Sequence, residues 1–409
     1  MIRTTAAPRP RLLPRSALLP TVAALAVAAL GCGPAATARP ASSSGDVAHV
    51  APPNAHAQIV GADDDPGGTA SEVFARAKAE MDLGKLAHAR ALFDRVVVAA
   101  RAEDPTVLSA LARAAAYDAA LCSERLGENK DARDRYAALA ADAPDSVDAT
   151  DAQLRRARLD VEIEDDADLA KSSAGLLARK ELGLGDRAEA LALQSLALVH
   201  AGDLASAQKD LLGAEKLLEQ LAPGDAPPPP QNAAAVWFAK GEAIRARGLT
   251  IALNPPPPDF SAKMEARCQS ILDAEDAYVD AIKTEQLQWA VRAGVRVASL
   301  YGDLHDDLMS IEAPKSVTTD AKKSLFRGAM RLRYRILLEK GLGTLERTLN
   351  LEQTTGVKST WFEHARQARA KLDKQLADEK AELAKLPYTE EQLKKALDDL
   401  AKGEPKTKA

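Results

Sequence analysis

Residues 120–144 decide the fold that we expect, and they read ALCSERLGENKDARDRYAALAADAP. They predict a helix, a tight turn at Gly127 and a second helix that stops at Pro144, since proline cannot continue a helix. Ala120 and Ala132 are small enough for the two helices to approach closely, and Tyr136 fills the space beside them. A hairpin of this size cannot bury its apolar face alone, so neighbours of the same kind are expected.

The spacing in this stretch resembles the tetratricopeptide repeat (TPR). In that family an alanine lies five residues after the turn glycine, a large residue nine after it and a proline seventeen after it. Gly127, Ala132, Tyr136 and Pro144 match all four positions, and other parts of the chain match some of them. The partial copies are Gly84 with Ala89 and Phe93, Gly202 with Ala207 and Leu211, and a degenerate copy with Asp165 as the turn and Ala170 as the small residue.

The resemblance implies an all-α protein, a TPR-like α-solenoid of antiparallel helix hairpins, with N-terminal repeats over residues 71–221. Composition agrees with helices: 46% of the residues are hydrophobic but only 4% are aromatic, and alanine supplies much of the apolar surface. Sheets would be richer in aromatic and β-branched residues.

The N-terminus has the pattern of a secretory signal. Four arginines, the last of them Arg15, precede an apolar run from Leu18 to Gly31 that contains no acid and is too short to span a bilayer well. The run ends in Ala29-Leu30-Gly31-Cys32, which resembles a bacterial lipobox, with Ala29 in place of the usual leucine.

This resemblance implies that residues 1–31 are a lipoprotein signal peptide and that Cys32 carries the lipid. Gly33, rather than Asp, after the cysteine implies sorting to the outer membrane, where the protein would face the periplasm. The alternative is an ordinary signal peptide cut near Ala38. Residues 32–70 are rich in Pro, Ala, Ser, Gly and Asp and have few large apolar residues, which predicts a disordered tether.

The net charge and the cysteine content bear on which partners and which covalent links the protein can have. The formal net charge is −5, and it becomes about −9 when the leader is removed, because four arginines and no acids leave with it. This balance argues against a nucleic-acid partner. Cys122 and Cys268 are expected as two separate thiols rather than as a disulfide, because each lies in an apolar helical context.

Proline runs divide the second half of the chain. Residues 227–230 and 255–258 are prolines, and helices are expected over 233–253, 288–309, 320–349 and 361–386. Thr389 and Gln392 have the spacing of a capping box, which predicts a last short helix. We therefore expect a C-terminal TPR-like helical region over 233–386, and a capping helix with a frayed tail over 387–409.

This half resembles the C-terminal region of periplasmic TPR lipoproteins, some of which are associated with gliding motility. The resemblance rests on AYVDAIKTEQLQWAVRAGVRVASLY at 277–301 and STWFEHARQARAKL at 359–372, with Trp289 and Trp361 in the expected places.

Motifs for catalysis are absent from the sequence: there is no HExxH, GxxxxGK or GxSxG. Gly341-Leu342-Gly343 is better explained by a turn or a helix end than by a nucleotide loop. His305-Asp306-Asp307 is better explained by a solvated helix face than by a metal site, because consecutive helical residues point about 100° apart. We therefore expect no enzyme, no cofactor and no small-molecule substrate.

The family resemblance implies a concave groove lined by first-helix positions of each repeat, which can be counted back from the turns. The counts give Phe74 and Lys78 from Gly84, Tyr117, Leu121 and Glu124 from Gly127, and Arg155 from Asp165. Aromatic, aliphatic and charged side chains of this kind suit peptide recognition. The alternative is that Phe74 and Tyr117 are simply core residues between repeats.

These expectations combine into a lipid-anchored TPR scaffold that binds other envelope proteins and helps to assemble a cell-envelope complex, with motility or export machinery as candidates. Two alternatives stay open. One is an enzyme-accessory factor that docks on peptidoglycan, and the other is a structural envelope protein that self-associates.

Lipid attachment can be tested at Cys32. Replacing Cys32 with Ser removes the thiol that the lipid would modify, so we expect the protein to move from the detergent phase to the aqueous phase in a phase-separation assay. Ser42→Ala, in the same segment, should stay with the detergent. Unchanged partitioning of Cys32→Ser would show that the chain is not anchored there.

Overall fold

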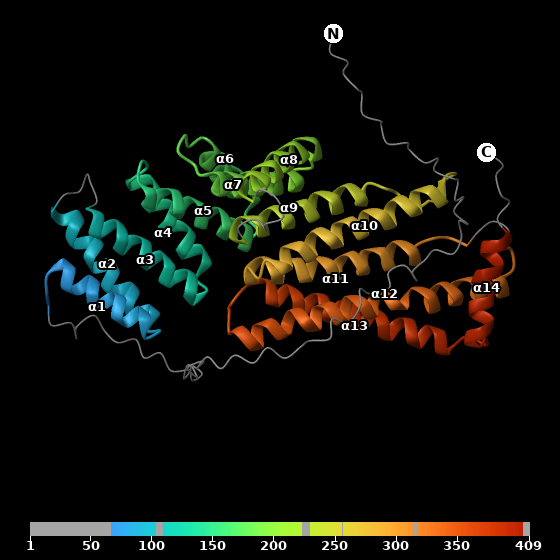
Figure 1. Ribbon diagram of the computed structural model, residues 1–409. Coiled ribbons are helices and arrows are strands. Elements are labelled where there is room, and N and C mark those ends of the chain that lie inside the picture. Colours follow the sequence, from blue (N-terminus) through green and yellow to red (C-terminus); the bar gives the residue numbers. More distant parts are fainter. Residues whose placement is uncertain (1–66, 104–108, 223–229, 256, 314–316, 404–409) are drawn as a thin grey trace, which may run out of the picture.

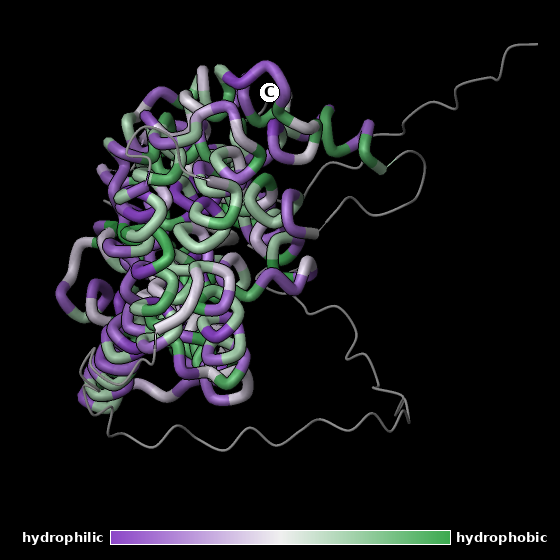
Figure 2. Tube along the Cα trace, turned by 90° about the vertical axis from the view of Figure 1, so that its left-hand side faces the viewer, coloured by the Kyte–Doolittle hydropathy of each residue, from purple (hydrophilic) through white to green (hydrophobic). Residues whose placement is uncertain are grey.

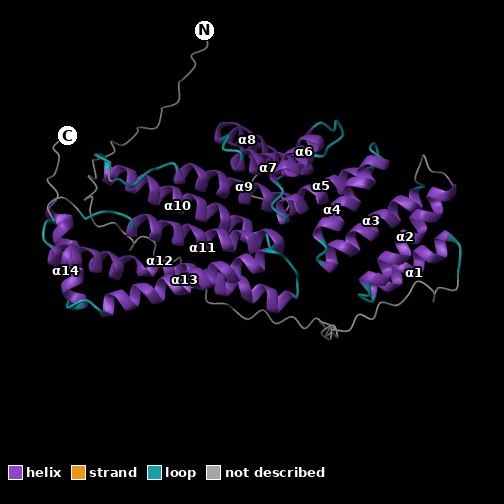
Figure 3. Ribbon diagram, turned by 180° about the vertical axis from the view of Figure 1, so that it is seen from behind, coloured by secondary structure: helices purple, strands orange, loops and turns teal. Residues whose placement is uncertain are grey.

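A computed structural model describes residues 67–103, 109–222, 230–255, 257–313 and 317–403 of the chain, and every regular element within these ranges is an α-helix (Figures 1 and 3). The predicted signal peptide, Cys32 and most of the predicted tether lie outside the described residues. The fourteen helices of the described ranges are α1 (Ala70–Asp82), α2 (Leu86–Glu103), α3 (Ala110–Leu126), α4 (Asn129–Asp142), α5 (Val147–Glu162), α6 (Asp166–Leu177), α7 (Leu184–His200), α8 (Leu204–Leu221), α9 (Pro230–Leu249), α10 (Phe260–Lys283), α11 (Leu287–Met309), α12 (Asp320–Thr355), α13 (Trp361–Ala384) and α14 (Glu390–Gly403).

Successive helices pack in pairs, and the same type of turn joins the two helices in each of the first four pairs. In each of them a residue with positive φ follows the first helix: Gly84 (75°), Gly127 (81°), Glu164 (58°) and Gly202 (82°). The next residue donates its backbone N–H to the carbonyl five residues earlier, over 2.9–3.0 Å. This is the Schellman ending of a helix, and it satisfies carbonyls that would otherwise lack a donor.

The third turn differs from the prediction by one residue. Positive φ falls on Glu164, and Asp165 is instead the N-cap of α6, where its side chain accepts from the backbone N–H of Asp168. As a result Leu169, five residues after Glu164, is buried in the small-residue slot, whereas the predicted Ala170 is exposed. The other predicted slot residues, Ala89, Ala132, Ala207, Phe93, Tyr136 and Leu211, are all buried.

The pairs form a curved row. Each odd-numbered helix from α1 to α11 contacts the next odd-numbered helix, whereas the even-numbered helices do not contact one another in this way before α12. Helices on the inner side of a curved row lie closer together, so the odd-numbered helices line the inner face. Figure 1 shows α1–α5 following one another, α6–α8 turning over the top, and α9–α13 stacked as long helices. The predicted TPR-like α-solenoid is confirmed.

The second half departs from the predicted helix bounds. The helix α9 begins at Pro230, the last residue of the proline run and three residues before the expected start at 233. Proline is tolerated at a first helical position because that N–H needs no partner within the helix. Gly341 lies inside α12, in agreement with the helix expected over 320–349 and not with a turn or a helix end. A Cβ on Gly341 would be 2.7 Å from Leu372 Cδ1, which shows that the glycine leaves room for α13 to pack closely.

The last helix covers the end of the row. It packs against α12, and Leu393 is buried there. The predicted capping box is confirmed: the Thr389 N–H donates to Gln392 Oε1 at 2.9 Å, and the Gln392 N–H donates to Thr389 Oγ1 at 3.3 Å. Figure 1 shows α14 lying across the ends of the long helices.

Hydrophobic and hydrophilic residues are mixed along the described helices (Figure 2). Among the described helices, none is at once long enough and apolar enough to cross a bilayer. Cys122 and Cys268 are not bonded to each other, and burial raises the pKa of the Cys122 thiol to about 11.

The packing of α9 on α10 generates a stability prediction. A Cβ on Gly241 would lie 2.5–2.9 Å from three ring atoms of Tyr278, whose ring is fully buried. Gly241→Ala should therefore destabilise the protein by about 1–3 kcal/mol through overpacking. Gly175→Ala is the matched control, since Gly175 is exposed in α6 with open space around it and should gain about 0.5–1 kcal/mol. Urea denaturation followed by circular dichroism would contradict the packing if both variants unfolded at the same midpoint.

Candidate partner-binding site

The six residues predicted from the TPR resemblance all lie on odd-numbered helices: Phe74 and Lys78 on α1, Tyr117, Leu121 and Glu124 on α3, and Arg155 on α5. All six side chains are half-buried. They therefore belong to helices that line the inner face of the row.

Three of these residues form one network between α3 and α5. Arg155 donates from Nε to the Tyr117 hydroxyl at 2.5 Å and from an amino group to Glu124 Oε2 at 3.1 Å. The Tyr117 hydroxyl donates to Asp151, and the Tyr136 hydroxyl donates to Glu124 Oε2 at 3.0 Å. Burial, followed by the hydrogen bond to Asp151, raises the pKa of Tyr117 to about 12, so this tyrosine is a neutral donor at physiological pH.

The other candidates have separate contacts. Lys78 makes an ion pair with Asp118 of α3 at 3.3 Å. The Phe74 ring packs edge-on against Phe93 of α2, with centroids 5.5 Å apart, and the Tyr117 ring packs in the same way against Tyr136, at 5.6 Å. Each aromatic ring thus contributes to the core of its own hairpin and keeps a partly exposed surface.

The shifted third turn changes which residues of α5 are equivalent to the candidates of α1 and α3. Ten residues before Glu164, in the place of Phe74 and Tyr117, is Leu154, which is buried. Six residues before Glu164, in the place of Lys78 and Leu121, is Arg158, which binds Glu189 of α7 through two nitrogens at 2.5 and 2.8 Å. Asn232 of α9 donates to the same Glu189 at 3.1 Å. A chain of polar contacts therefore continues along the inner face from α5 to α9.

Glu162, at the end of α5, joins distant parts of the row. It accepts from Arg292 of α11 at 2.6 Å, and it also accepts from the Ser359 hydroxyl at 2.7 Å and the Thr360 N–H at 2.8 Å, just before α13. Glu162 and Arg292 are buried, at 5% and 1% exposure. Burial alone would raise the pKa of Glu162, but Arg292 and the hydroxyl and N–H donors outweigh it and hold that pKa below its ordinary value.

Arginine and tryptophan side chains alternate beside this ion pair. The Arg292 guanidinium lies 4.6 Å from the Trp289 ring centroid and 6.0 Å from that of Trp361. The Arg296 guanidinium lies 5.1 Å from the Trp361 ring centroid. Such stacking is attractive because the face of an aromatic ring carries partial negative charge. It fixes Trp361 where α13 begins.

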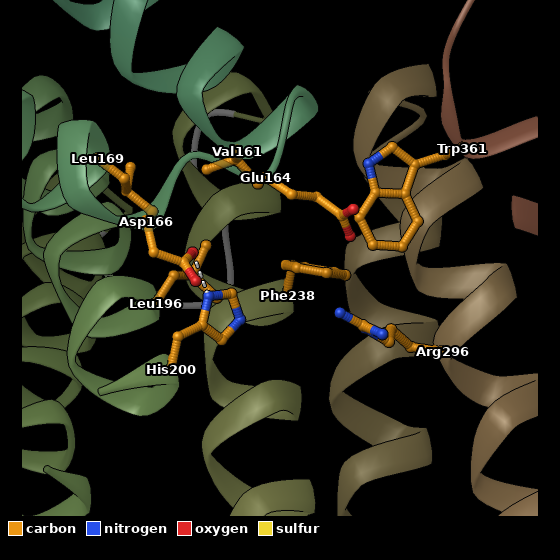
Figure 4. A pocket seen from close by; sticks show the side chains of 9 residues that line it. All are labelled: Val161, Glu164, Asp166, Leu169, Leu196, His200, Phe238, Arg296 and Trp361. Atoms are coloured by element: carbon orange, nitrogen blue, oxygen red, sulfur yellow. Dashed lines mark hydrogen bonds and ion pairs between the residues drawn. The ribbon is translucent and has the colours of Figure 1, made fainter. Parts of the chain in front are cut away.

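A cavity of about 190 Å³ opens next to Trp361, where α5, α6, α7, α9, α11 and α13 meet (Figure 4). His200 Nδ1 lies 2.5 Å from Asp166 Oδ1 on one side, and Arg296 forms an ion pair with Glu242 at 2.9 Å on the other. The residues around the cavity are Val161, Glu164, Asp166, Leu169, Leu196, His200, Phe238, Arg296 and Trp361.

One predicted surface group is buried. His305 is only 3% exposed, so the expectation that it lies on a solvated helix face is wrong. Asp307, two residues later, forms an ion pair with Arg267 at 2.9 Å. Within the described ranges, no group of three or more His, Cys, Asp or Glu residues is placed to hold a metal ion.

Sequence reasoning did not find the cavity. Trp289 and Trp361 were noted, but Glu162, Arg292 and Arg296 have no local motif, and Glu162 is 130 residues from Arg292. The available signal was charge on strongly apolar helix faces: both arginines lie among the valines and alanines of 290–298.

Comparisons with known proteins give likenesses to solved structures but not to families or curated sequences. No family model matches this chain, and neither does any curated protein sequence. A crystal structure of a tetratricopeptide repeat protein from Parabacteroides merdae ATCC 43184 is similar with a TM-score of 0.37 and 14% sequence identity, over 75% of this chain and 99% of that one.

The buried ion pair generates a pH-dependent prediction. Glu162→Gln leaves Arg292 as a buried charge without its counter-ion, so we expect a loss of about 3 kcal/mol at neutral pH. The pKa of Glu162 is lowered by folding, so its contribution is present above about pH 4.5 and is lost as the pH falls through the folded-state value. The difference between the wild type and Glu162→Gln should therefore shrink below about pH 4.5.

Glu265 of α10 is exposed, and Glu265→Gln is the matched control, with an expected change within about 0.5 kcal/mol. Denaturant unfolding at several pH values measures both variants. A Glu162→Gln protein as stable as the control at neutral pH would show that the ion pair does not hold the row together.

Proposed function

We propose that this protein is a helical-repeat scaffold that binds a partner protein along the inner face formed by its odd-numbered helices. The observation that carries the proposal is the row of hairpins itself, because stacked repeats present an extended concave surface built from successive first helices. The side chains predicted for recognition, from Phe74 on α1 to Arg155 on α5, lie on those helices.

The composition of this face suits protein recognition. Tyrosine, tryptophan and arginine are the residues most often found at the energetic centre of protein interfaces. Tyr117 and Arg155 are only half-buried, and each already has hydrogen-bond partners that hold it in one orientation. A surface that is ordered before binding loses less conformational entropy when the partner arrives.

The place of action is also part of the proposal. The apolar run before Cys32 and the lipobox-like sequence support a lipoprotein of the outer membrane that faces the periplasm. In that setting the partners are other envelope proteins, and the scaffold would help to assemble an envelope complex such as motility or export machinery.

Capture of partners from detergent-solubilised envelopes tests the inner face. We expect Tyr117→Ala combined with Arg155→Ala to lower the yield of the specific partners by about tenfold or more, as for the loss of central interface residues. Val98→Ala is the matched control, since Val98 is 67% exposed on α2, outside the row of odd-numbered helices. Thermal unfolding checks that each variant is folded.

If the double variant is folded and still captures the same partners at the same yield, binding along this face is contradicted. Light scattering of the wild type separates the scaffold from the self-associating alternative, because a monomer excludes self-assembly.

A further inference from the structure

We infer that the cavity beside Trp361 binds an uncharged amide group of the partner segment. The amide oxygen would accept from Trp361 or Arg296, and the amide N–H would donate to Glu164 or His200. This rests on the proposed function, since the amide is carried by a partner that lies along the inner face.

One wall of the cavity offers donors. Trp361 is 2% exposed, and its indole N–H has no acceptor among the described residues. A buried donor without a partner costs about 1–3 kcal/mol, so a ligand oxygen placed there would offset that cost. Arg296 is the second donor: Glu242 lies against its Nε, and Figure 4 shows the tip of its guanidinium pointing into the cavity.

The opposite wall offers acceptors. Glu164 extends toward Trp361 from the turn between α5 and α6, and its side chain is 56% exposed (Figure 4). His200 directs Nδ1 at Asp166, so a neutral ring presents Nε2 as an acceptor on the cavity side.

The two walls together disfavour a charged ligand. A carboxylate would be attracted by Arg296 but repelled by Glu164 and Asp166. An ammonium group would be attracted by these two carboxylates, but it has no lone pair to accept from the Trp361 indole N–H or from Arg296. An amide carries an acceptor and a donor in one neutral group, so both walls can be satisfied without an unpaired charge.

The size of the cavity agrees with a single side chain or peptide unit. Its volume of about 190 Å³ is a little above the roughly 150 Å³ of an engineered cavity that accepts benzene, and below the roughly 300–1,000 Å³ of pockets for drug-sized ligands. Phe238 supplies a flat apolar wall on which a planar amide can stack.

The test uses the full-length protein labelled with ¹⁵N in its three tryptophans. The indole N–H resonance of Trp361, assigned through Trp361→Phe, is followed during titration with four capped amino acids: N-acetyl-N′-methylamides of glutamine, alanine, glutamate and lysine. The resonances of Trp237 and Trp289 are internal controls, because neither residue lines this cavity.

We expect the glutamine compound to shift the Trp361 resonance most strongly and to leave the other two in place. An equal shift with the alanine compound also supports the inference and identifies the main-chain amide as the source. A larger shift with the glutamate or lysine compound, or no shift with any of the four, would overturn it.

Glu164→Ala removes one acceptor, and we expect it to weaken binding of the glutamine compound by about threefold to tenfold, the value of one hydrogen bond. Glu164 is at the surface of a turn, so this variant should fold. An unchanged affinity would contradict the role of the acceptor wall. No partner protein is present in these titrations, so their failure is distinguishable from a failure to capture partners on the inner face.

Discussion

The buried ion pair between Glu162 and Arg292 holds the described parts of the row in one shape. It joins the third hairpin to the sixth, and Ser359 and Thr360 bring the start of α13 to the same carboxylate. Taking both charges out of water is costly, and only good geometry with further hydrogen bonds makes such a pair tolerable. The cavity beside Trp361 exists because this contact holds its two walls, α5–α6 and α11–α13, against each other.

Local features of the fold could be predicted from the sequence. Gly84, Gly127 and Gly202 mark turns because a helix that ends with positive φ strongly favours glycine, and the buried Ala89, Ala132 and Ala207 follow at a fixed distance. The capping box of Thr389 and Gln392 depends only on residues three apart. In each case the cause and its effect lie within one or two turns of helix.

Features that depend on tertiary packing could not be predicted in this way. Glu164 adopts positive φ although it is not glycine, which displaced the expected third turn by one residue. Gly341 is a glycine in the middle of α12 because Leu372 of α13 occupies the space that a Cβ would take. His305 is buried by helices that follow it in the sequence, and nothing near Glu162 indicates a partner 130 residues away.

The proposed scaffold would present a fixed inner surface only if its curvature is fixed, and the ion pair joins the two parts of the row whose relative position sets that curvature. A double-mutant cycle with Glu162→Gln, Arg292→Met and the combined variant measures this most directly, as the coupling in the free energy of unfolding. We predict a coupling of about 2 kcal/mol or more, because each single change leaves the other group buried without its partner. If the two single effects add up to the effect of the combined variant within about 0.5 kcal/mol, the two residues are independent, and their contact does not hold the third hairpin against the sixth.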